Sequence, residues 1–154
     1  MGQIDKRLAE LGIILPEAAK PVANYVPWVR TGNLVYISGQ GPIEGGKVLY
    51  PGTLGKDVSL EDGAKSARLC AINVLAQIKD AVGGDLDKVK RVVKLLGFVN
   101  ATADFKDHPK VINGASDLMV EVFGDKGRHA RSAVASPSLP MGISTEVEAI
   151  VEVE

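Results

Sequence analysis

The sequence predicts an α+β fold, a two-layer sandwich in which two helices cover one face of a single mixed sheet. Two long segments carry apolar residues at three- and four-residue steps, the pattern of helices with one buried face. Strand-like segments surround them, so that the order of elements reads ββαβαββ. Because two helices suffice to cover one face of one sheet, this order favours two layers.

The composition is that of one folded domain spanning residues 1–154. Of these residues 45% are hydrophobic and 24% are charged, as in soluble globular proteins. The formal net charge is −1 and only 5% of residues are aromatic, which disfavours a nucleic-acid-binding surface. The single cysteine, Cys70, excludes a disulfide within the chain and a cysteine-rich zinc site.

The N-terminal region carries no recognisable targeting signal. It has no apolar core of a signal peptide, and no apolar run in the chain approaches the roughly 20 residues of a membrane span. We therefore expect a cytoplasmic protein with no membrane partner. A short helix is predicted over residues 5–11, followed by an extended segment that contains Pro16 and Pro21.

The first two strands are predicted over residues 25–30 and 34–39. The turn signal Thr31-Gly32-Asn33 joins them as a hairpin, and residues 34–37 are apolar on both faces, which is typical of a strand covered on both sides. Residues 41–57 are predicted to be a loop or loose hairpin. Their glycines match neither common phosphate-binding pattern, so we interpret them as turn residues.

The first long helix is expected to begin after Ser59, a typical N-cap residue, and to end at Gly83-Gly84. Cys70 falls beside its apolar stripe and is interpreted as a small core residue rather than a nucleophile. A long strand is predicted over residues 89–99. The second helix is expected over residues 109–123, where Gly124 ends it.

The last two strands are predicted over residues 131–135 and 145–153. In the final strand, Val147 and its apolar neighbours at every second position should face the helices, which puts Glu146, Glu148, Ile150 and Glu152 on the opposite face. Glu148 and Glu152 fit a solvated face. Glu146 stands at the start of the strand, near a loop where functional sites tend to lie.

Apolar residues also point to an interface on the sheet. Tyr36, Leu96 and Phe98 occupy strand positions beyond those that two helices can cover. A large uncovered apolar face on a soluble protein predicts a partner, and the simplest partner is a second copy of the chain.

Few residues stand out as chemical groups. Arg131 begins an otherwise apolar strand, and its planar fork of donors suits a carboxylate or a phosphate, although a single arginine is more often a surface or ion-pair residue. His108 and His129 lack a cluster at metal spacing and fit surface or loop positions. The sequence contains no G-x-S-x-G nucleophile motif.

Several short pieces of the sequence form a recognisable series that spans residues 25–150. They are Tyr25, Ser38-Gly39-Gln40, Asn73, Asn113, Ala130-Arg131-Ser132, Leu139-Pro140 and Glu146-Val147-Glu148-Ala149-Ile150. In their order and spacing these pieces resemble the RidA/YjgF family of reactive-intermediate deaminases, and in particular its members of about 150 residues with an N-terminal extension, here residues 1–24.

The resemblance implies a chorismate-mutase-like fold and a homotrimer, in which the sheets line a central barrel and the active sites lie in clefts between subunits. It also implies the hydrolysis of reactive enamines and imines, such as 2-aminoacrylate and 2-iminobutyrate, to 2-keto acids and ammonia. The ligand is then a small 2-imino or 2-keto acid, and no metal or organic cofactor is expected.

The resemblance assigns roles to individual residues. Arg131 matches the arginine that clamps the substrate carboxylate, and Glu146 matches the acid that positions or activates water. The residues that match cleft-lining positions are Tyr25, Ser38, Gly39, Asn113 and Ala133. Ala133 replaces the family's usual cysteine, and the residues around Tyr25 differ from the usual family pattern.

Two other functions remain open at this point. One is a non-catalytic trimer that binds small carboxylates or another protein. The other is a ribonuclease, an activity attached to part of the family, although the chain has no basic stripe and no paired histidine site.

Overall fold

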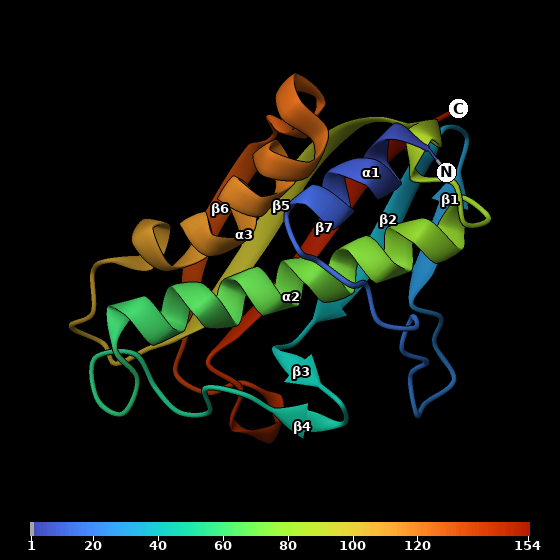
Figure 1. The fold of residues 1–154 in the computed structure, drawn as a ribbon. Helices are drawn as coiled ribbons and strands as arrows, with labels where there is room; N and C mark the ends of the chain where they lie inside the picture. Colours follow the sequence, from blue (N-terminus) through green and yellow to red (C-terminus); the bar gives the residue numbers. More distant parts are fainter. Residues whose placement is uncertain (1) are drawn as a thin grey trace.

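A mixed five-stranded sheet forms one layer of the molecule, with the strand order β1-β2-β7-β5-β6 (Figure 1). The computed structural model describes residues 2–154. Neighbouring strands are antiparallel except for β5 and β6, which are parallel. The strands of this sheet are β1 (Trp28–Thr31), β2 (Leu34–Gln40), β5 (Val89–Asn100), β6 (Ala130–Ser136) and β7 (Thr145–Val153).

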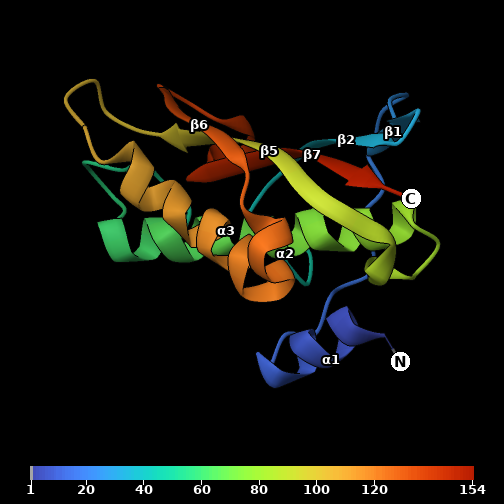
Figure 2. The same cartoon turned by 90° about the horizontal axis from the view of Figure 1, so that it is seen from above.

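Two long helices cover one face of the sheet, and a third, short helix packs outside them (Figure 2). The helices are α1 (Gln3–Glu10), α2 (Leu60–Ala81) and α3 (His108–Phe123). The predicted α+β layers and the mixed sheet are confirmed. The two expected helices cover the sheet, and the structure adds that the short helix α1 packs against α3. The order ββαβαββ is confirmed, with a small hairpin of β3 (Ile43–Glu44) and β4 (Lys47–Val48) added inside the predicted loop.

The core lies between the sheet and the two long helices. Along β7 the residues Val147, Ala149, Val151 and Val153 are buried and the intervening residues are half-buried, as the alternation in the sequence predicts. Ser59 caps α2 by accepting a hydrogen bond from the backbone N–H of Asp62 at 3.1 Å. Cys70 is fully buried, in agreement with its interpretation as a core residue, and burial raises the pKa of its thiol to about 12.

Two predicted boundaries are wrong by more than one residue. The first strand begins at Trp28 rather than Tyr25, since Pro27 has no N–H to donate to a neighbouring strand and the residues before it run through bends. The N-terminal helix begins at Gln3 rather than Asp5. Asp87, far away in the sequence, supplies its cap by accepting hydrogen bonds from the N–H groups of Gln3 and Ile4, each at 2.9 Å.

The other face of the sheet, here called the open face, is not covered by any of the described residues. Tyr36 is 44% exposed there, so the expectation that its strand is covered on both sides is wrong for the single chain. Leu96 and Phe98 lie on the same face and are half-buried, which confirms that they point away from the helices. None of the helices in residues 2–154 combines the length and apolar character needed to span a bilayer.

Candidate functional site

Arg131 lies near the start of β6, the edge strand of the sheet, and its side chain is on the helix-covered side. In the sheet register it stands beside Leu95, a core residue. Its Nη1 donates hydrogen bonds to Asn113 Oδ1 at 2.7 Å and to Ser116 Oγ at 3.3 Å, both on α3. The structure therefore brings the predicted residues Arg131 and Asn113 together. We call Arg131, Asn113 and Ser116 the arginine half-site.

Among the described residues, the guanidinium of Arg131 is held by two neutral groups, the Asn113 amide and the Ser116 hydroxyl. Among residues 2–154 it forms no ion pair with a carboxylate. Its two Nη1 hydrogens are used by Asn113 and Ser116, whereas Nε and Nη2 make no hydrogen bond within the described chain. The Nε–Nη2 edge is one that binds a carboxylate through two parallel hydrogen bonds. The half-site thus presents a positive charge and a pair of parallel N–H donors that have no partner in residues 2–154.

Glu146 lies at the start of β7 and projects onto the open face. It stands in register with Phe98, and its carboxylate lies directly over the backbone of Gly39. A Cβ added to Gly39 would come within 2.7 Å of Glu146 Oε2, so glycine leaves the space that the carboxylate occupies. Ser38 precedes this glycine on β2. The predicted residues Ser38, Gly39 and Glu146 are therefore neighbours, and we call them the glutamate half-site.

The environment of Glu146 disfavours its charged form. Burial raises the pKa of the carboxyl above its ordinary value of 4.5, and the nearby negative charge of Glu148 raises it further. No cation or donor among the described residues offsets these effects. The carboxylate is thus a stronger base than one on an exposed surface, which suits a group that takes a proton from water.

A change of Glu146 to glutamine is expected to raise the melting temperature at neutral pH. Because the pKa of Glu146 is higher in the folded than in the unfolded chain, ionisation destabilises the fold above the folded pKa and not below the unfolded pKa. The difference in melting temperature between Glu146→Gln and the wild type should therefore shrink as the pH falls through the raised pKa of Glu146, and it should vanish at lower pH.

Thermal unfolding of Glu146→Gln across the acidic and neutral range checks this expectation. Glu44, which is exposed and forms no ion pair with another described residue, is the matched control, and Glu44→Gln should not raise the melting temperature at neutral pH. A glutamine variant that is less stable than the wild type at neutral pH would contradict the role of burial.

The two half-sites of one chain lie apart. Arg131 is on the helix side of β6 and Glu146 is on the open face of β7, with strand β5 between them. Along the strands, their registers differ by the three residues from Leu95 to Phe98, about 10 Å at the usual rise. A small molecule bound to Arg131 therefore cannot reach Glu146 of the same chain.

The remaining predicted residues take separate positions. Tyr25 is 59% exposed and lies in the irregular segment before β1. Ala133 lies on β6 on the same side as Arg131 and packs against the core. Asn73, part of the family resemblance, donates hydrogen bonds to the carbonyl oxygens of Gly41 and Ile43, both at 2.9 Å, and so holds the loop that follows β2.

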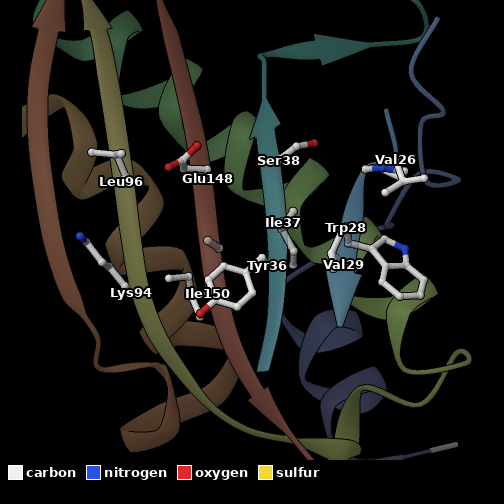
Figure 3. A pocket seen from close by; sticks show the side chains of 12 residues that line it. Val26, Trp28, Val29, Tyr36, Ile37, Ser38, Lys94, Leu96, Glu148 and Ile150 are labelled. Carbon is white, nitrogen blue, oxygen red and sulfur yellow. The ribbon is translucent and has the colours of Figure 1, made fainter. Parts of the chain in front are cut away.

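The open face is hollowed into a cavity of about 450 Å³. Ser38 lines it at one end, while Tyr36, Leu96 and Ile150 give it apolar walls (Figure 3). Glu148 lies in the same wall. The cavity contains neither Arg131 nor Glu146, so it is a feature of the uncovered sheet rather than a place where the two half-sites meet.

Two residues in or beside the arginine half-site were not predicted from the sequence: Ser116, which belongs to it, and His129, which contacts Ser116. Ser116 lies on α3 one turn after Asn113, a spacing that the sequence does show but that acquires meaning only once Arg131 is placed beside α3. His129 lies in a loop, as expected, yet it is half-buried and both ring nitrogens are within hydrogen-bond distance of a partner. The described residues contain no group of three or more side chains suited to a metal ion.

Comparisons with known proteins agree with this fold. The family model described as "YjgF/chorismate mutase-like, putative endoribonuclease" matches residues 5–153. Protein TCP17 of Trypanosoma cruzi is 46% identical over 152 residues, which cover 98% of this chain and 94% of that protein. A 2-iminobutanoate/2-iminopropanoate deaminase of Dermatophagoides farinae is 29% identical over 143 residues, covering 92% of this chain and 95% of the relative.

A solved structure is similar over nearly the full length. Protein Atu1372 from Agrobacterium tumefaciens, described as having unknown function, is 50% identical and superposes with a TM-score of 0.92, covering 98% of this chain and 92% of that one. The predicted resemblance to RidA/YjgF proteins is thereby confirmed. With its sheet, its helices and the family match over residues 5–153, the chain belongs to the YjgF/chorismate-mutase-like family.

Proposed function

We propose that the protein hydrolyses 2-imino acids, and the enamines that interconvert with them, to 2-keto acids and ammonia. The observation that carries the proposal is the Nε–Nη2 edge of Arg131, which no described residue pairs with and which Asn113 and Ser116 hold in place through Nη1. A half-buried guanidinium without a carboxylate partner favours an anionic ligand. Its planar geometry suits a carboxylate bound through two hydrogen bonds.

The active site is proposed to form between copies of the chain. The arginine half-site and the glutamate half-site lie too far apart to act on one small molecule within a chain, so a neighbouring copy has to supply the second. The edge strand β6 and the apolar open face leave surface for such a neighbour. A homotrimer with the sheets around a central barrel, as the family resemblance implies, would join the two half-sites three times.

The proposed reaction needs only positioning and proton transfer. With the substrate carboxylate on Arg131, the carbon of the protonated imine is oriented toward a water molecule held by Glu146. The water oxygen bonds to this carbon while Glu146 takes the water's proton, and the imine double bond becomes the amine of a carbinolamine. Glu146 returns the proton to the amine.

The carbinolamine then breaks down to products. Its hydroxyl proton passes to Glu146, the carbonyl forms and the carbon–nitrogen bond breaks, releasing ammonia. Ammonia takes the proton from Glu146 and leaves as ammonium, so that imine cation and water give keto acid and ammonium in balance. The raised pKa of Glu146 supports its use as both base and acid. The name of the deaminase from Dermatophagoides farinae supports small aliphatic imino acids as the substrate class.

An assay that generates the imine in place tests the proposal. An amino-acid oxidase with catalase produces the 2-imino acid, and semicarbazide traps whatever imine survives. Adding the protein is expected to lower the trapped product and to speed the release of keto acid. Alanine, 2-aminobutyrate, leucine and phenylalanine as oxidase substrates would define the preferred side chain. An unchanged yield of trapped imine with every one of these amino acids would refute the proposed hydrolysis.

A second candidate is carboxylate binding without turnover. This candidate is favoured because Asn113 and Ser116 hold Arg131 in place without Glu146, so the arginine half-site can bind a carboxylate by itself. In this case a small 2-keto acid such as 2-ketobutyrate should raise the melting temperature of the wild type, while the trapping assay shows no effect of the protein.

A further inference from the structure

His129, Ser116 and Arg131 form one continuous chain of hydrogen bonds beside the half-site. His129 precedes β6 by one residue, Ser116 lies on α3 and Arg131 lies on β6. His129 Nε2 is 2.9 Å from Ser116 Oγ, and Ser116 Oγ is 3.3 Å from Arg131 Nη1. All three residues are partly buried. The hydroxyl of Ser116 thus links the imidazole of His129 to the guanidinium of Arg131.

The directions of these hydrogen bonds follow from chemistry. His129 Nδ1 lies 2.6 Å from the carbonyl oxygen of Gly127, which can only accept, so Nδ1 carries the hydrogen. In the neutral ring Nε2 is then an acceptor, and the Ser116 hydroxyl donates to it. The lone pairs of the same hydroxyl remain free to accept from Arg131 Nη1. Each donor and acceptor in this series of hydrogen bonds therefore has a compatible partner.

The residue whose carbonyl oxygen holds His129, Gly127, is closely packed against α3. Gly127 is buried against the backbone of α3, and a Cβ added to it would collide with the carbonyl group of Met119 and come within 2.9 Å of the nitrogen of Val120. Because both contacts are with the helix backbone, only glycine allows this close approach, which places the carbonyl oxygen that holds His129 beside α3. The segment Gly127-Arg128-His129-Ala130-Arg131 thus ties the arginine to α3 at both ends.

Two acceptors on Nη1 constrain the guanidinium more than one does. Asn113 alone would hold one N–H and leave the planar group free to tilt about that bond. Ser116 Oγ accepts from the second N–H. Because the Ser116 hydroxyl donates its hydrogen to His129, the orientation of the hydroxyl is set and its lone pairs point toward Arg131. With both N–H groups engaged, the direction of the Nε–Nη2 edge is set.

We propose that His129 and Ser116 are positioning residues that fix the carboxylate-binding edge of Arg131. The inference rests on the proposed function in taking Arg131 as the group that binds the ligand carboxylate. Neither residue touches the ligand. His129 orders the hydroxyl of Ser116, and Ser116 orders the guanidinium.

Paired substitutions test these roles. His129→Leu removes the acceptor, whereas His129→Gln places an amide oxygen near the position of Nε2. Ser116→Ala removes the hydroxyl and Ser116→Thr keeps it. His129→Leu and Ser116→Ala are expected to weaken 2-ketobutyrate binding, measured by calorimetry, about tenfold. His129→Gln and Ser116→Thr are expected to stay within about twofold of the wild type.

The background of Arg131→Lys separates positioning from a general structural role. Lysine has no Nη1 for Ser116 to hold. In this background His129→Leu and Ser116→Ala should not weaken 2-ketobutyrate binding further. A second tenfold loss there, or failure of His129→Gln to restore binding in a protein with wild-type melting temperature, would overturn the proposal.

A ligand-free measurement keeps the test separate from the proposed function. Nitrogen-15 NMR should show slowed rotation of the Arg131 Nη groups in the wild type and in His129→Gln, and faster rotation in His129→Leu. Equal rotation in all three proteins would overturn the positioning role. If the wild type positions Arg131 in this way but does not hydrolyse imines, the proposed function fails and the positioning role stands.

Discussion

Replacing Arg131 with alanine is expected to lower kcat/KM for 2-imino acids by about 10²–10⁴-fold. Hydrogen bonds to charged groups contribute about 1.5–3 kcal/mol each, and the free edge of Arg131 offers two to a carboxylate. The loss of both hydrogen bonds weakens substrate binding, and the imine carbon is no longer held in position for attack by water. The oxidase-coupled trapping assay measures the effect, with calorimetry of 2-ketobutyrate binding as the companion measurement.

Lysine at position 131 separates charge from geometry. It keeps the positive charge but cannot form the two parallel hydrogen bonds, so Arg131→Lys should recover only part of the loss. Arg128 is the matched control, because it lies three residues away, is exposed, and pairs with Asp125 alone among the described residues. Arg128→Ala should act like the wild type. Equal rates for Arg131→Ala and the wild type would rule out the carboxylate clamp.

Two inactive variants are expected to restore activity when they assemble together. If each site takes its arginine from one copy and its glutamate from the next, Arg131→Ala and Glu146→Gln damage different halves. A ring of three that contains both variants has one junction where an intact arginine meets an intact glutamate. Mixed trimers should therefore show about one third of the wild-type activity.

Coexpression with two different affinity tags gives the mixed assemblies, purified on both tags in turn. Light scattering should give a mass of about three times 16.2 kDa for these and for the wild type. Each variant assembled alone should be inactive. Mixed assemblies that stay as inactive as the single variants would show that both residues serve the same chain's site, against the separation of the half-sites described here.

Much of the fold follows from local patterns in the sequence. The boundaries of β7 were predicted correctly because valine and glutamate alternate along it, so both the strand and its buried face can be read directly. The start of α2 was predicted because Ser59 caps it with its own side chain. The N-terminal helix was misplaced because its cap, Asp87, comes from a distant segment.

The candidate site residues also divide into those that sequence motifs predict and those that only the packing reveals. Arg131, Glu146, Ser38 and Gly39 could be named from the sequence because they match short motifs in a fixed order. The face on which Arg131 lies could not be read, since the residues that follow it in β6 are small or apolar on both sides and give no alternation. Ser116 and His129 had no signal of their own, because their importance depends on α3 packing beside β6.

The sequence by itself determined the order of the elements, the buried faces of α2 and β7, and the family to which the chain belongs. These depend on interactions between residues close together along the chain, or on motifs that are read one after another. Only the tertiary structure decided that Arg131 and Glu146 lie on opposite faces of the sheet and that Asn113 and Ser116 accept hydrogen bonds from the arginine, with His129 in contact with Ser116. Strand order and helix packing bring distant residues together, and no local spacing encodes the resulting contacts.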